Sequence, residues 1–121
     1  MSGEEAAFFA QWPELLPVYA ALREALLGEF ARVEARVQRT QISLREKHVF
    51  AVVSLPRTRR RPGRLIVSFG LPCRLDAPRI AQAVEPYPNR WTHHVMVERA
   101  EQVDAELLGW LREAYWFSMA K

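Results

Sequence analysis

Apolar residues alternate with polar ones through most of the middle of the chain, and this period of two constrains the fold more than any other feature. Successive side chains of a β-strand point to opposite faces, so alternation predicts strands with one buried face. Four such stretches occur, over residues 33–44, 49–55, 64–69 and 91–98. Because no helical stretch alternates regularly with them, they predict an antiparallel sheet of four or five strands rather than a doubly wound parallel sheet.

The first of these stretches changes its apolar parity part-way. Val33 and Val37 are apolar at odd positions, whereas Ile42 and Leu44 are apolar at even ones. A straight strand cannot exchange its buried face, so we predict a β-bulge or a tight bend at residues 39–41. The stretches 49–55 and 64–69 are expected to form an antiparallel hairpin.

Helical spacing of apolar residues flanks the strands on both sides. We predict a short helix over residues 6–12, a longer one over 17–31, and a last helix that begins after Asp104 as its N-cap. A short helix over 77–84 is also predicted, with Asp76 as its N-cap. The expected fold class is α+β, with N-terminal and C-terminal helices flanking the sheet, and the 121 residues form a single domain, 1–121.

Composition excludes several classes of protein. Half of the residues are hydrophobic and 26% are charged, as in ordinary globular domains. Cys73 is the only cysteine, which excludes an intrachain disulfide and a cysteine-rich zinc site. The N-terminal residues are acidic, unlike a signal peptide, and no apolar run is long enough to span a bilayer. We therefore expect a cytoplasmic protein that makes no membrane contact.

The positive charge of the chain is local. The net charge is +3, yet the segment 57–64 holds five of the 17 basic residues, and the rest of the chain carries 12 basic and 14 acidic ones. One hypothesis is that this segment binds nucleic-acid phosphates. The favoured interpretation is a solvated hairpin tip, since no aromatic residue for base stacking lies within it. Its arginines are Arg57, Arg59, Arg60, Arg61 and Arg64.

His93 and His94 are adjacent in the last predicted strand, so they are expected to point to opposite faces of the sheet. The face of His93 is the more apolar one, and we predict that His93 is packed in the core while His94 lies on the open face. No metal site is expected, because His48, His94, Glu46 and Glu98 have no ligand spacing, and no cofactor is expected either. We assign no catalytic residue. The alternative is a hydrolase-like enzyme with His94 as base and Ser43 or Thr40 nearby.

Polar residues gather at the predicted irregularities of the sheet and at the start of the predicted helix 77–84. If they converge, they form a pocket for an anion, with backbone N–H groups and guanidinium groups as donors. The preferred hypothesis is therefore a non-enzymatic binding module for an anionic small molecule or a partner protein. The predicted ligand-binding residues are Arg39, Thr40, Gln41, Ser43, Arg79, Arg90 and His94.

The last helix is rich in aromatic residues. Trp116 and Phe117 cannot both face the apolar stripe that contains Leu111 and Tyr115, so one of them is expected to be exposed. An exposed aromatic residue is typical of an interface, and a homodimer is predicted on that ground.

Several stretches together resemble one known family, the uncharacterised domain of unknown function 5655. The resemblance extends from about Val33 to the last helix and implies a small domain that occurs alone or at the end of longer chains. It implies no activity and no catalytic residues. The matching stretches are Arg39-Thr40-Gln41-Ile42-Ser43-Leu44, Val49-Phe50-Ala51-Val52, Arg74-Leu75-Asp76-Ala77-Pro78-Arg79-Ile80, Pro88-Asn89-Arg90-Trp91-Thr92-His93-His94-Val95, and Val103-Asp104-Ala105-Glu106-Leu107 with Trp110-Leu111 and Ala114-Tyr115.

Overall fold

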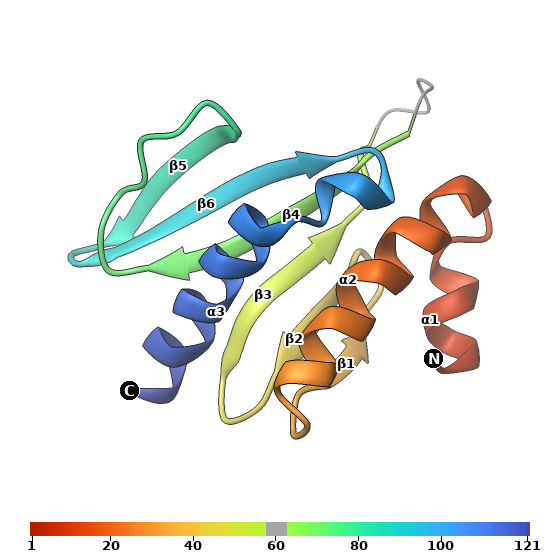
Figure 1. Cartoon of the computed structure of the whole chain (residues 1–121), viewed down its shortest axis with the longest axis horizontal. Coiled ribbons are helices and arrows are strands. Elements are labelled where there is room, and N and C mark those ends of the chain that lie inside the picture. The colour runs from red at the N-terminus through yellow and green to blue at the C-terminus, as the bar shows by residue number, and fades with distance from the viewer. Residues whose placement is uncertain (58–62) are drawn as a thin grey trace.

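A computed structural model describes residues 1–57 and 63–121, and its centre is one antiparallel sheet. Six strands in the described residues form this sheet in the order β1-β2-β3-β4-β6-β5 (Figure 1). The strands are β1 (Glu34–Val37), β2 (Gln41–Arg45), β3 (Val49–Ser54), β4 (Leu65–Leu71), β5 (Ile80–Tyr87) and β6 (Arg90–Val97). Strands β3 and β4 therefore lie at the centre of the sheet, with β2 and β1 on one side and β6 and β5 on the other.

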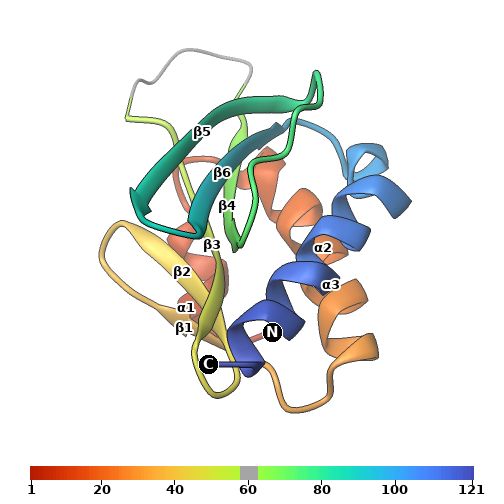
Figure 2. The ribbon, with the colours of Figure 1, turned by 90° about the vertical axis from the view of Figure 1, so that its left-hand side faces the viewer.

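Two long helices cover one face of this sheet. Helix α2 (Leu16–Glu29) and helix α3 (Ala105–Met119) lie on the same side, as Figure 2 shows, and the shorter α1 (Gly3–Phe8) lies near the β1 edge. Two short 3-10 helices, Pro13–Leu15 and Ala100–Gln102, complete the described helical segments. No helix among the residues described is long and apolar enough to cross a membrane.

The core lies between the two long helices and the alternating residues of the strands. Val53, Val67 and Val95 are fully buried on the covered face of the sheet, and Leu22 and Leu111 face them from the helices. The next residue of each strand points to the opposite face, as the period of two requires. That face carries no long helix (Figure 2), and we call it the open face.

The change of parity at residues 39–41 is a hairpin turn, not a bulge within one strand. The N–H group of Gln38 donates to the carbonyl of Gln41 at 2.8 Å, and Val37 is paired with Ile42. The positions of each β1–β2 pair add up to 79, an odd number. Partners that face the same side therefore have opposite parity, which explains the switch without a kinked strand.

The predicted helix over 77–84 is wrong, because residues 80–84 belong to strand β5, which the sequence did not predict. Only a single turn forms before β5, with the N–H of Ile80 donating to the carbonyl of Ala77 at 3.0 Å. The register against β6 shifts between Ile80 and Gln82 and again between Val84 and Tyr87. These irregularities hide the period of two in the sequence, while pairing with β6 overrides the helix signals of Asp76 and the alanines. The count of four to five strands is corrected to six.

The N-terminal helices are shifted relative to their predicted bounds. Helix α1 begins at Gly3 rather than at Ala6, because the hydroxyl of Ser2 accepts from the N–H of Glu5 and the Glu5 carboxylate accepts from the N–H of Ser2. This reciprocal pair is a capping box. Helix α3 begins after Asp104, as predicted, and the Asp104 carboxylate accepts from the N–H of Leu107 at 3.0 Å.

Candidate functional site

The open face of the sheet is hollowed at its centre. Every residue that lines this hollow comes from a strand, and its volume is about 750 Å³. Uncharged hydrogen-bonding side chains and apolar side chains both line it, which suits a ligand with both polar and apolar parts. The lining residues are Gln41, Val52, Ser54, Ile66, Ser68, Ala81, Gln82, His94 and Met96.

His94 is the one ionisable side chain of this central hollow. Its Nδ1 atom lies 2.7 Å from Oγ of Ser68, the residue paired with it on β4, and Gln82 is paired with it on β5. Burial lowers the pKa of His94, so the imidazole is neutral at pH 7. A neutral imidazole has one donor and one acceptor nitrogen, and the hollow therefore offers both kinds of hydrogen-bonding group without a net charge.

Two further hollows adjoin the central one along the open face. The first, of about 860 Å³, shares Gln41, Ser54 and Ile66 with it. The second, of about 70 Å³, shares Val52 and Ser68. We call the three together the open-face groove. None of the described residues that line it is an aspartate or a glutamate.

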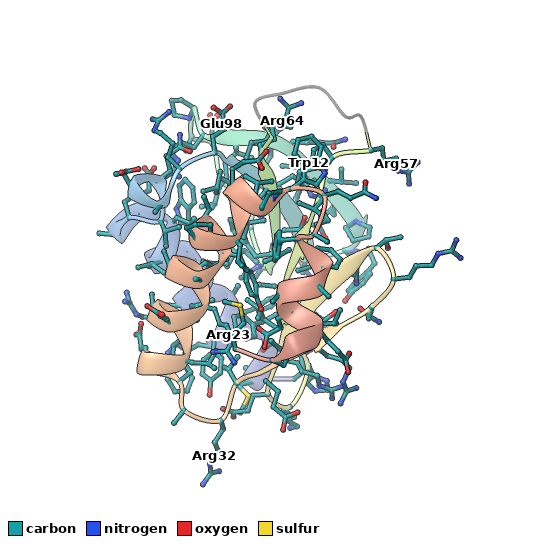
Figure 3. All side chains as sticks on the ribbon, turned by 90° about the vertical axis from the view of Figure 1, so that its right-hand side faces the viewer. Trp12, Arg23, Arg32, Arg57, Arg64 and Glu98 are labelled. Carbon is teal, nitrogen blue, oxygen red and sulfur yellow. The ribbon has the colours of Figure 1, made fainter. Side chains whose placement is uncertain are left out.

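One end of the groove is cationic because of the β1–β2 turn and the segment after β3. Arg39 and Thr40 line it from the turn and Arg57 from the other side, while Ala7 and Phe8 of α1 form part of its wall. Figure 3 shows Arg57 extending away from the body of the protein at this side. Neither Arg39 nor Arg57 makes an ion pair with a described residue.

The opposite end of the groove contains Arg90. An ideal Cβ atom built on Gly70 would lie 2.7 Å from Cζ and from Nη2 of Arg90 and 2.8 Å from Nη1. These near-equal distances place the flat side of the guanidinium against the backbone of Gly70. The glycine therefore makes room for Arg90, which also has no ion-pair partner among the described residues.

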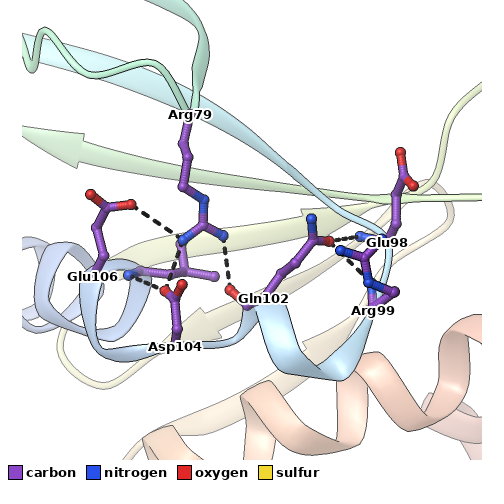
Figure 4. Close-up of polar contacts among 7 residues, drawn as sticks. Arg79, Glu98, Arg99, Gln102, Asp104 and Glu106 are labelled. Atoms are coloured by element: carbon purple, nitrogen blue, oxygen red, sulfur yellow. Dashed lines mark hydrogen bonds and ion pairs between the residues drawn. The ribbon is translucent and has the colours of Figure 1, made fainter.

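Five of the seven predicted ligand-binding residues line the open-face groove, and two do not. Ser43 is buried beside it, where its hydroxyl donates to Oε1 of Gln38 at 2.6 Å. Arg79 lies away from the groove and holds the start of α3 (Figure 4), with contacts of 2.8 Å to Asp104 and 3.4 Å to Glu106. Arg79 was expected to converge with the other site residues because residues 77–84 were predicted to form a helix. That helix does not form, since strand β5 begins at Ile80. The five that line the groove are Arg39, Thr40, Gln41, Arg90 and His94.

His93 has the structural role that its apolar face predicts. It is fully buried, stacks on Phe69 with ring centroids 5.4 Å apart, and accepts a hydrogen bond at Nε2 from the N–H of Leu75 at 2.9 Å. Burial lowers the pKa of His93, and the nearby carbonyls of Phe69 and Trp91 offset only part of that shift. His93 is therefore neutral, and its hydrogen bond with Leu75 holds the segment after β4 against the sheet.

The arginine-rich segment is described only at its two ends. Arg57 lines the groove, whereas Arg64 is half-buried near Trp12 (Figure 3). Arg59, Arg60 and Arg61 lie outside the described residues. The prediction that this segment is a solvated tip, or that it binds nucleic acid, is tested only by experiment.

Several residues matter here that the sequence did not single out. Ser54, Ser68 and Gln82 line the central hollow with His94, yet serines and glutamines on strands carry no signal by themselves. The alternation placed Ser68 on the open face, but only the register shows that it stands opposite His94. Within residues 1–57 and 63–121, no three His, Cys, Asp or Glu side chains are grouped as a metal site.

The last helix exposes one of its aromatic residues, as expected. Trp116 is 58% exposed, while Phe117 is half-buried and Tyr115 is buried. Trp116 and Phe117 line an apolar hollow with Leu71 and Leu75. The homodimer remains a prediction.

Comparison with known proteins identifies the family. The model of a family described as "Domain of unknown function (DUF5655)" matches residues 5–118. The chain belongs to this family. No curated protein and no solved structure matches the chain. The resemblance noted in the sequence is thus confirmed, and it now includes the N-terminal helices, where the Glu5 carboxylate of α1 accepts hydrogen bonds from Tyr19 and Arg23 of α2.

Proposed function

We propose that this chain is a non-enzymatic binding module whose open-face groove takes an anionic organic ligand. The observation that carries the proposal is the groove itself, with arginines at both ends, neutral polar side chains between them and no acidic residue along it. Guanidinium groups that face a hollow without a carboxylate partner can bind an incoming carboxylate or phosphate.

The centre of the groove supports a ligand that is more than a bare anion. The apolar lining residues Val52, Ile66 and Met96 favour contact with carbon, and Met96 is 41% exposed. Ser54, Ser68 and His94 line the same hollow and can both donate and accept hydrogen bonds. A ligand that combines an uncharged, hydrogen-bonding body with a terminal anionic group satisfies both parts of the groove.

Thermal unfolding with a panel of phosphate-bearing and carboxylate-bearing metabolites tests this proposal. A compound that binds only the folded state raises its apparent stability, by about 2.7 kcal/mol at a hundredfold excess over Kd. The expected compound loses its effect in an Arg39→Ala, Arg57→Ala variant and keeps it in Arg32→Ala. Arg32 is an exposed control that points away from the body of the protein (Figure 3).

Nuclear magnetic resonance then locates the bound compound. Amide shifts of Gln41, Ser54, Ser68 and His94 are expected to move together on titration. Absence of any stabilising compound, or shifts confined to the face of α3, would overturn the proposal.

The contact between Ser68 and His94 favours a second candidate, hydrolysis with Ser68 as nucleophile. Among the described residues of the groove, however, no carboxylate orients the imidazole, and the backbone N–H groups of paired central strands are engaged in the sheet rather than free for an oxyanion. Turnover of a chromogenic ester separates the two functions. Catalysis predicts activity that Ser68→Ala removes and Ser54→Ala retains, whereas a binding module shows none.

A further inference from the structure

The position of the Arg90 guanidinium against Gly70 gives more information about the ligand than the charge of Arg90 does. The near-equal approach of three guanidinium atoms to the Cβ position of Gly70 means that the plane faces the sheet. Its other side then faces away from the sheet, on the open face. Cζ of Arg90 also lies over the ring of Tyr87, 6.0 Å from the ring centroid, at the long end of the cation–π range.

A guanidinium held flat in this way is a stacking platform as well as a charge. Protein arginines stack on nucleobases through this plane, and single-stranded nucleic acids are bound by such platforms next to cationic tracks. Tyr87 is 53% exposed and adds an aromatic ring beside the platform. Ser68 and Thr92 line the same end of the groove and offer hydroxyl groups to a base edge or a sugar.

The register of the sheet sets the length of the groove. Phe69 is paired with Ala51, so its neighbour Gly70 lies level with Phe50, whereas Gln41 is paired with Ser54. The four residues between these levels correspond to roughly 13 Å along β3. Arg39 lies beyond Gln41, so the platform and the cationic end are too far apart for one compact anion to reach both.

We propose that the ligand of the open-face groove is a short single-stranded stretch of nucleic acid, with one base stacked on Arg90 and a phosphate at Arg39 and Arg57. This inference rests on the proposed function and narrows it. A single-stranded nucleic acid carries the groups that the groove can bind. These are planar bases with hydrogen-bonding edges, and anionic phosphates repeated along an extended molecule. The arginine-rich segment is not needed for it, apart from Arg57.

Fluorescence anisotropy with a short labelled single-stranded DNA, at low and at physiological salt, tests the proposal. Arg90→Lys keeps the charge and removes the plane, so we expect about a tenfold loss of affinity. Gly70→Ala is expected to cause a similar loss by lifting the guanidinium from its seat. Arg32→Lys is the matched control and should bind as the wild type does.

The salt dependence of DNA affinity measures the contribution of the cationic end of the groove. Arg39→Ala removes one phosphate contact, so the slope of log affinity against log salt should fall by about 0.7. Arg90→Lys should leave this slope unchanged, because it keeps its charge. The two ends of the groove are thereby separated by two different readouts.

Three results would overturn the nucleic-acid proposal. They are equal binding of duplex DNA, wild-type binding by Arg90→Lys, and displacement of the DNA by an acidic peptide whose own binding is equally sensitive to Arg90→Lys. If no oligonucleotide binds at low salt but compact phosphate compounds still stabilise the protein through Arg39 and Arg57, only this inference fails. If neither binds, the proposed function fails with it.

Discussion

The two faces of β6 show how differently one strand is used on its two sides. His93, on the covered face, is fully buried and accepts a hydrogen bond from the main chain of Leu75. His94, on the open face, pairs with a serine hydroxyl in a hollow that a ligand can enter. Both rings are neutral because burial lowers the pKa of each. The difference between them is therefore access to a ligand and not charge.

The arginines divide along the same lines. On the helix side, Arg23 pairs with Glu5, Arg79 with Asp104, and Arg112 with Glu29. Along the open-face groove, Arg39, Arg57 and Arg90 have no carboxylate partner among the described residues. These three helix-side arginines are thus neutralised locally. Unpaired arginines also occur outside the groove in the described part of the chain, as at Arg32, so it is the gathering of three of them along one hollow without carboxylates that points to a site.

The largest expected effect comes from truncating a side chain on the covered face. Leu44 is fully buried, so Leu44→Ala should lower the free energy of unfolding by about 2–5 kcal/mol, through lost burial and the cavity left behind. Met96→Ala on the open face should cost less than about 1 kcal/mol, because Met96 is already 41% exposed. Urea denaturation measures both. Equal losses would mean that the open face is covered in the free protein.

A paired charge on the helix side should rank next. Burial raises the pKa of Glu5, but hydrogen bonds from the Ser2 backbone, Tyr19 and Arg23 outweigh it and lower the pKa to about 2. We expect Glu5→Gln to cost about 2 kcal/mol at pH 7, since the amide keeps only one acceptor oxygen for three donors and loses the ion pair with Arg23. Glu4→Gln, at an exposed neighbouring position, should cost almost nothing.

The pH dependence of this cluster has a definite sign. A carboxylate whose pKa is lowered in the folded state contributes stability that is present above its unfolded value near 4.5. That contribution is lost as the pH falls from about 4.5 to about 2. Acid unfolding curves should therefore differ between wild type and Glu5→Gln at neutral pH and converge only below about pH 2. Curves that stay parallel would show that the Glu5 carboxylate is not the charged acceptor.

The two histidines give the sharpest test of the two faces. His93→Phe preserves the ring that packs on Phe69 but leaves the partly buried N–H of Leu75 without its acceptor, at a cost of about 1 kcal/mol. His94→Phe removes only a partly exposed contact with Ser68 and should cost less than about 0.5 kcal/mol. Thermal unfolding at pH 7.5 compares them.

Both histidines should also act on stability in weakly acidic solution. Each has a pKa lowered below its unfolded value of about 6.5, so its contribution is complete above that value and is lost as the pH falls below it. His93→Phe and His94→Phe should each reduce the fall in melting temperature between about pH 6.5 and 5. A wild-type protein whose melting temperature rises on acidification across that range would contradict the neutral state of both rings.

Sequence alone predicts most of the sheet, because the period of two carries direct physical information about burial. The stretches 49–55, 64–69 and 91–98 became β3, β4 and β6, and Asp104 marks the start of α3. Strand β5 was missed because its two register shifts erase the period and Asp76 and Pro78 imitate a helix start. This edge strand forms through pairing with β6 across the two-residue turn Pro88-Asn89, in which Asn89 has a φ of 64°.

The candidate site divides in the same way between local and long-range information. Alternation placed His94 on the open face and His93 in the core, and that much follows from the residues themselves. The partnership of Ser68 with His94 depends on strand order and register, and the seat of Arg90 depends on the glycine of a neighbouring strand. Arg79 was assigned to the site because of the predicted helix over 77–84. Since that helix does not form, Arg79 lies away from the groove.

The smallest expected effect on stability belongs to Gly70, and comparison with Gly63 shows why. A Cβ atom on either glycine would lie closer than 3.0 Å to a side chain. At Gly63 the neighbour is the ring of Trp12, which is buried in the core and cannot move away, so Gly63→Ala should cost about 1–3 kcal/mol. At Gly70 the neighbour is the tip of Arg90, which can swing into solvent, so Gly70→Ala should change the free energy of unfolding by less than about 0.5 kcal/mol.

This contrast makes Gly70→Ala a probe of function that leaves the fold intact. Urea denaturation should show Gly63→Ala destabilised and Gly70→Ala close to wild type. If Gly70→Ala is as destabilised as Gly63→Ala, the guanidinium of Arg90 is fixed as part of the packing and is not a surface held ready for a ligand. If stability is unchanged, any loss of oligonucleotide affinity in Gly70→Ala reports the displaced guanidinium alone.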